Sequence, residues 1–87
     1  MNLILEPSSA DPPTLQRSTA VRLVAAAPSL WRVVDPRGLV IGHLQAHTQA
    51  GGIRYRARRF HAASRAFREL GEFWSADDAL ECLRLAH

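Results

Sequence analysis

The spacing of apolar positions changes from a helical period to an alternating one near Trp31. Residues 18–28, STAVRLVAAAP, place apolar side chains at helical spacing between a serine or threonine that can cap a helix and a proline that ends it. This pattern predicts a short helix. The same residues also suit an extended strand, because valine and leucine fit a pleated surface.

Beyond Trp31, apolar and polar positions alternate with a period of two, which is typical of β-strands. Asp-Pro-Arg-Gly at residues 35–38 favours a type I turn, and Gly51 and Gly52 allow the chain to reverse again. Gly71 is expected to end the last strand. Four strands are therefore predicted, at residues 31–35, 39–46, 53–60 and 65–70.

The final element is a helix that begins after Ser75. Asp78 stands three places after this serine, an acidic form of the capping box, and Trp74 can pack against Ala79 across the cap. Apolar side chains then recur on one helical stripe, which must pack against another element. They are Ala76, Ala79, Leu80, Leu83 and Ala86.

These elements predict one small α+β domain over residues 19–87. It has an antiparallel sheet of three to four strands, a C-terminal helix packed on one face, and a short N-terminal helix. Residues 1–18 contain three prolines and few large apolar groups, so they predict a disordered arm. The large aromatic side chains are expected in the core under the helix. They are Trp31, Phe67, Phe73 and Trp74.

Charge adds a second feature to this picture. All eleven basic residues are arginines, eight residues are acidic, and the formal net charge is +3. Six of the arginines fall between residues 54 and 68, whereas the acidic residues lie mainly in the arm and near the last helix. This asymmetry favours an anionic partner such as nucleic acid.

The stretch IRYRARRF, residues 53–60, places an arginine at every second position. In a strand, alternate side chains share a face and lie roughly 6.6 Å apart, twice the rise of about 3.3 Å, which is comparable to the spacing of phosphates along a nucleic-acid strand. Solvation of a wet sheet face is the competing explanation. The candidate nucleic-acid-binding residues are Arg54, Arg56, Arg58, Arg59, Arg65, Arg68, Arg32 and Arg37.

Catalytic motifs are missing from the sequence. It contains no glycine-rich phosphate loop, nucleophile elbow or cluster with metal-ligand spacing, so we expect neither an enzyme nor a cofactor. The single cysteine, Cys82, fits a reducing cytoplasmic location. The start of the chain has too short an apolar run for a signal peptide or a membrane span.

Residues 52–79 carry the pattern G-x-x-Y-x-A-R, followed by F-x-x-L-G-x-F-x-S-x-x-D-A. This pattern resembles the small DNA-binding domains of the Apetala2 and ethylene-response type and the arm-binding domains of tyrosine-type phage integrases. The resemblance implies a sheet that lies in the major groove, and it nominates Arg54, Arg56 and Arg58 together with Arg68. The sequence then indicates an accessory or regulatory DNA-binding protein, with DNA favoured over RNA.

The same ending is also similar to Hic-type antitoxins, whose small domains bind a partner protein. Under this alternative, an apolar face near Trp31, Phe73 and Trp74 would bind another chain. Unguarded sheet edges also allow a homodimer.

Overall fold

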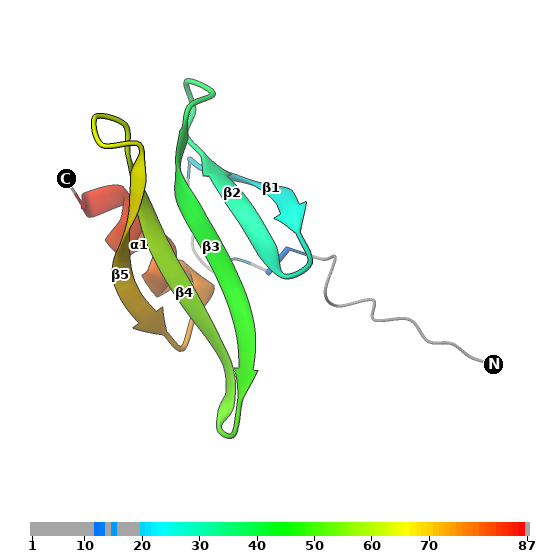
Figure 1. Ribbon diagram of the computed structural model, residues 1–87. Coiled ribbons are helices and arrows are strands. Elements are labelled where there is room, and N and C mark those ends of the chain that lie inside the picture. The colour runs from blue at the N-terminus through cyan, green and yellow to red at the C-terminus, as the bar shows by residue number, and fades with distance from the viewer. Residues whose placement is uncertain (1–11, 14, 16–19, 87) are drawn as a thin grey trace.

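The computed structural model describes residues 12, 13, 15 and 20–86 of the chain, which form an antiparallel sheet and one helix (Figure 1). Each strand pairs with its neighbours in the sequence, so the sheet is a simple meander. The predicted α+β class is confirmed, but the sheet has five strands instead of three or four. The elements are β1 (Arg22–Ala27), β2 (Leu30–Val34), β3 (Val40–Gln49), β4 (Gly52–His61), β5 (Ala66–Phe73) and α1 (Ala76–Leu85).

The additional strand is β1, in the segment for which a short helix was predicted. Arg22 is opposite Val34 and Val24 is opposite Arg32, so β1 pairs along most of β2. Pairing with a neighbouring strand satisfies the backbone groups of this segment and overrides its weak helical spacing. The alternative of an extended strand is therefore the correct one.

The turn between β2 and β3 is held by Asp35. The backbone N–H of Gly38 donates to the Asp35 carbonyl at 2.9 Å, which closes the expected four-residue turn. The Asp35 carboxylate accepts hydrogen bonds from the backbone N–H groups of Arg37 and Leu39. The bond from Leu39 is the main cause that lowers the pKa of Asp35, with further contributions from Arg37.

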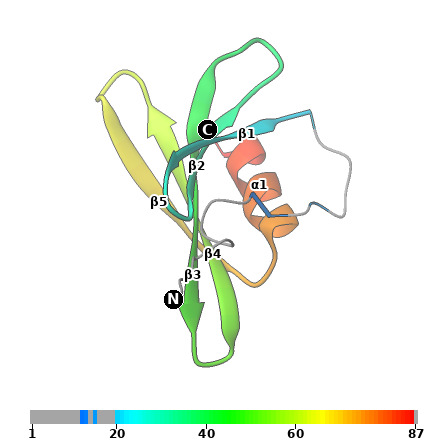
Figure 2. The same cartoon turned by 90° about the vertical axis from the view of Figure 1, so that its right-hand side faces the viewer.

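The core lies between α1 and one face of the sheet (Figure 2). Gly42 lets the helix come close, because a Cβ there would collide with the Leu83 side chain and with the backbone oxygen of Arg58. Ala57 is fully buried beneath the same helix. The buried cluster consists of Trp31, Val33, Leu44, Ala57, Ala76, Ala79, Leu80 and Leu83.

The helix begins as predicted. The Ser75 hydroxyl accepts a hydrogen bond from the backbone N–H of Asp78 at 3.1 Å. Asp77 and Asp78 lie in the first turn and Arg84 in the last, which suits the helix dipole at both ends. The apolar stripe packs across β3, β4 and β5.

A β-bulge in β5 decides which side chains reach each face. Ala57 is opposite Gly71 and Arg58 is opposite Glu69, so Leu70 has no direct partner on β4. Gly71 has a φ of +131° and does not end the strand, which continues to Phe73. The extra residue inverts the alternation between the two halves of β5.

The predicted disordered arm, residues 1–18, lies almost entirely outside the described residues. Leu15 is described, and it packs against the core cluster. Within the described part of the chain, no helix combines the length and apolar character that crossing a membrane requires.

Candidate nucleic-acid interface

The sheet face opposite α1, which we call the open face, presents its side chains in cross-strand rows. Leu44 and Ala57 are in the core, so their sequence neighbours point to the open face. The register then aligns these neighbours across strands. The rows are Phe60–Phe67, then Arg32–His43–Arg58–Glu69, then Gln45–Arg56–Glu72, and last His47–Arg54.

Arg54, Arg56 and Arg58 all lie on the open face, as the alternation predicts, but the charges of Arg56 and Arg58 meet carboxylates of the same protein. Arg56 donates to Glu72 at 2.7 Å, and the same oxygen of Glu72 lies 3.2 Å from His47 Nε2. This bond raises the pKa of Arg56 and is the main cause that lowers the pKa of Glu72.

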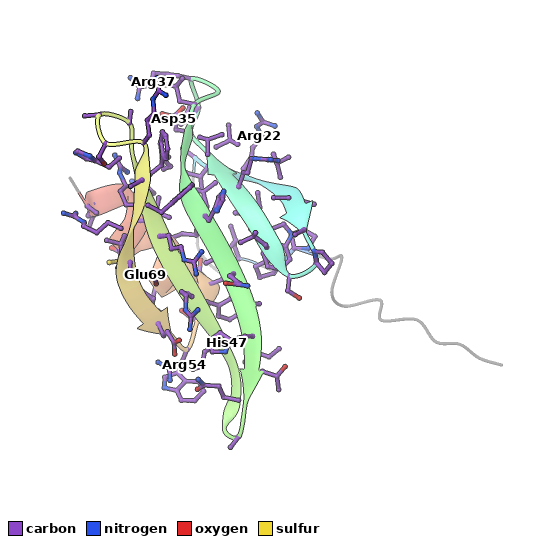
Figure 3. The ribbon with its side chains drawn as sticks, in the orientation of Figure 1. Arg22, Asp35, Arg37, His47, Arg54 and Glu69 are labelled. Atoms are coloured by element: carbon purple, nitrogen blue, oxygen red, sulfur yellow. The ribbon has the colours of Figure 1, made fainter. Side chains whose placement is uncertain are left out.

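Arg58 and Arg54 have partners as well. The Nε of Arg58 donates to a carboxylate oxygen of Glu69, whose other oxygen lies 4.0 Å from Arg56 Nε. Arg54 donates to the backbone oxygen of Glu72 at 3.2 Å, and its guanidinium carbon lies 4.2 Å from the centre of the Trp74 ring. Of these residues, His47 and Arg54 lie near one end of the sheet, and Glu69 lies farther toward its middle (Figure 3).

Arg32 differs from Arg56 and Arg58. It is exposed on β2, and its side chain makes no ion pair with any described residue. It lies beside His43, whose pKa is lowered first by burial and then by the positive charges of Arg32 and Arg58. Two positive charges, those of Arg32 and Arg58, therefore lie close to His43 in this row.

Two predicted residues, Arg59 and Arg68, do not belong to the open face. They are opposite each other on β4 and β5, one position out of phase with Arg58 and Glu69. Arg59 donates to the backbone oxygen of Leu83 at 3.0 Å, at the C-terminal end of α1. Arg59 breaks the alternation of arginines on β4. Arg68 was expected on the same side as Arg54, Arg56 and Arg58, but the bulge at Leu70 turns it to the other side.

Arg37 and Arg65 lie in the β2–β3 and β4–β5 turns, which project from the same end of the sheet (Figure 1). Arg37 pairs with the Asp35 carboxylate at 3.0 Å while most of its side chain stays exposed. Arg65 has a φ of 55°, and its backbone N–H bonds to the Ala62 carbonyl. Both can add positive charge to that end of the open face.

Aromatic rings occupy the open face near these turns. The His43 and Phe67 rings are stacked, with centroids 4.4 Å apart and planes at 28°. The Phe60 and Phe67 centroids are 5.2 Å apart. Phe67 was expected in the core, but it is 42% exposed because the bulge turns it outward. Gly71, a glycine inside a strand pattern, was the available signal for that bulge.

Trp74 was also expected in the core and is instead 59% exposed, against 3% for the buried Trp31. The apolar surface required by the protein-binding alternative therefore lacks Trp31. Trp74 is already covered in part by Arg54.

In the described part of the chain, no three His, Cys, Asp or Glu side chains lie close enough to hold a metal ion. No protein-family model, curated protein or solved structure matches this chain.

Proposed function

We propose that the open face binds nucleic acid, with DNA favoured over RNA. The observation that carries the proposal is the charge of one cross-strand row. Arg32 and Arg58 flank His43, and Glu69 is the only carboxylate of that row. A cationic surface of this kind attracts phosphates and holds a backbone against it.

The ion pairs on the open face are compatible with this role. Glu69 and Glu72 are both partly exposed, and exposed ion pairs contribute little net stability. A guanidinium group binds carboxylate and phosphate oxygens with the same planar geometry. Arg56 and Arg58 can therefore release a carboxylate oxygen and bind a phosphate oxygen in its place. We expect the carboxylates to weaken binding without abolishing it.

The proposed role is that of an accessory or regulatory factor in the cytoplasm, acting by binding and not by catalysis. The resemblance of residues 52–79 to Apetala2-type domains supports a mode in which the sheet faces the nucleic acid. Such a mode suits this chain, because α1 covers the opposite face.

A homodimer belongs to the same proposal. In the described part of the chain, no strand pairs with the outer edge of β1, and Ala25–Ala27 carry no charge that would guard it. Two copies joined edge to edge would double the binding surface. Sedimentation velocity would test this, and a single monomeric species at high concentration would contradict it.

The binding proposal is tested by fluorescence anisotropy with a short labelled DNA, compared with RNA of the same sequence. Arg32→Gln should weaken binding, and the slope of log K against log salt should fall by about 0.9 for duplex DNA or about 0.7 for a single strand. Arg84→Gln on α1 makes the same charge change and is the matched control.

Equal losses in Arg32→Gln and Arg84→Gln would mean that the attraction is general and not located on the open face. Failure of the wild-type protein to bind any of these nucleic acids at low salt would end the proposal.

A further inference from the structure

The ring of Phe67 is a flat apolar surface beside the row that contains Arg32, His43 and Arg58. His43 stacks on it and Phe60 contacts it at a tilt of 54°, yet 42% of Phe67 remains exposed. A core ring would be covered by aliphatic side chains from a second layer. Phe67 instead lies on the face that no described helix or strand covers.

A hollow lies beside these rings. It is formed by the β4–β5 hairpin, has a volume of about 520 Å³, and is lined by Phe60, Phe67 and the turn that follows His61. This volume falls within the range of about 300–1,000 Å³ typical of small-ligand sites. Arg59 and Arg68, which lie out of phase with the open face, also line it. A planar group with a nearby negative charge would therefore be complementary to this place.

The distances along β4 connect the rings to the phosphate-binding groups. Phe60 and Arg58 are two residues apart on one face, which places them roughly 6.6 Å apart, twice the rise of about 3.3 Å. A base resting on the rings would thus hold its own phosphate within reach of Arg58 or Arg32.

We propose that this end of the open face binds single-stranded DNA, with one unpaired base stacked on Phe67. The inference rests on the proposed function and names its substrate class. Bases inside a duplex present only their edges, which are read by hydrogen-bonding groups, and phenylalanine has none. An unpaired base offers its π-face, for which an exposed aromatic ring beside arginines is a sequence-tolerant partner.

The test is a comparison of Phe67→Ala, Phe67→Leu and Phe67→Tyr by anisotropy, with a short single strand and with its duplex. Stacking predicts that alanine and leucine both weaken single-strand binding by about tenfold, whereas tyrosine preserves it. A merely apolar contact would survive the change to leucine. Circular dichroism and melting curves establish that each variant is folded.

Trp74→Leu is the matched control, since it removes an exposed ring at the other end of the sheet. It should leave single-strand affinity unchanged, because Arg54 already covers that ring. The fluorescence of a 2-aminopurine base in the DNA gives a second signature of stacking. It should be quenched in the wild-type complex and not in the Phe67→Leu complex.

The outcomes separate the two proposals. Wild-type affinity in Phe67→Leu, or tighter binding of the duplex than of the single strand, would overturn the stacked base. Nucleic-acid binding that depends on Arg32 would then still support the proposed function. Absence of binding to both the single strand and the duplex would overturn both.

Discussion

The two ends of the open face carry similar side chains but place them in different surroundings. At the paired end, defined by His47, Arg54, Arg56 and Glu72, cations are held by a carboxylate and a backbone oxygen of the same chain. At the aromatic end, defined by Arg32, His43, Phe60 and Phe67, rings contact one another and Arg32 has no carboxylate partner among the described residues.

This difference teaches that a row of arginines is not in itself a binding surface. Of the arginines that dominate the sequence, Arg56 and Arg58 are paired with carboxylates of the protein, and Arg54 bonds to a backbone oxygen and lies over the Trp74 ring. Arg32 stands alone in the sequence, yet its side chain has no ion-pair partner among the described residues. Whether the charge of an arginine is available to a ligand depends on where Glu69 and Glu72 lie. The bulge at Leu70 places both of these carboxylates on the open face.

The largest expected effect comes from removing part of the core that packs beneath both ends of the sheet. Leu83 is fully buried under the sheet, so Leu83→Ala should lower the free energy of unfolding by about 2–5 kcal/mol. Urea unfolding followed by circular dichroism measures this loss. A change below about 1 kcal/mol would show that the two ends do not depend on α1.

Much of this framework could be predicted from the sequence. The cap at Ser75 and the turn that starts at Asp35 depend on local chemistry, in which a side-chain oxygen satisfies nearby backbone N–H groups. The long strand β4 follows from strict alternation over residues 53–60. Features of this kind depend only on residues that are close in the sequence, so they can be predicted without the rest of the fold.

The remaining features depend on contacts between distant residues. The segment that forms β1 has weak preferences, and pairing with β2 determines its conformation. The faces of Phe67 and Arg68 depend on the bulge at Leu70, because one extra residue exchanges the faces of the side chains on one side of it relative to those on the other. Alternation alone therefore placed Arg54 correctly and placed Arg68 wrongly.

The next prediction removes the carboxylate of the paired end. Glu72→Gln takes away the charged partner of Arg56, so it should raise nucleic-acid affinity roughly twofold to threefold through the added net charge. The same variant should melt at a lower temperature, because the Arg56 guanidinium loses its strongest bond. Glu81→Gln on α1 makes an equal charge change and should raise affinity less. Lower affinity in Glu72→Gln would mean that Glu72 supports the bound state.

Acid titration should expose the same pairing in the free protein. The pKa of Glu72 is lowered from its ordinary value of 4.5, so the folded state binds a proton less readily than the unfolded state. The resulting stability is present above pH 4.5 and is lost as the pH falls through the lowered value. Across this range, the melting temperature should depend less steeply on pH in Glu72→Gln than in the wild-type protein. Identical slopes would show that the pair does not stabilise the fold.

The smallest expected effect is at the aromatic end. The pKa of His43 lies below its ordinary value of 6.5, because burial and two arginines oppose its protonation. Its contribution to stability is present above pH 6.5 and is lost as the pH falls through the lowered value. His43→Gln should remove this slope, as measured by melting temperature against pH. An unchanged slope would assign the pH dependence to another group.

The most direct test of nucleic-acid binding by the open face is an amide chemical-shift titration with single-stranded DNA at two salt concentrations. We expect the largest shifts at Arg32, His43, Phe60 and Phe67, smaller ones at Arg54, and a reduction of all of them at high salt. Shifts confined to α1, or no shifts at low salt, would contradict the account.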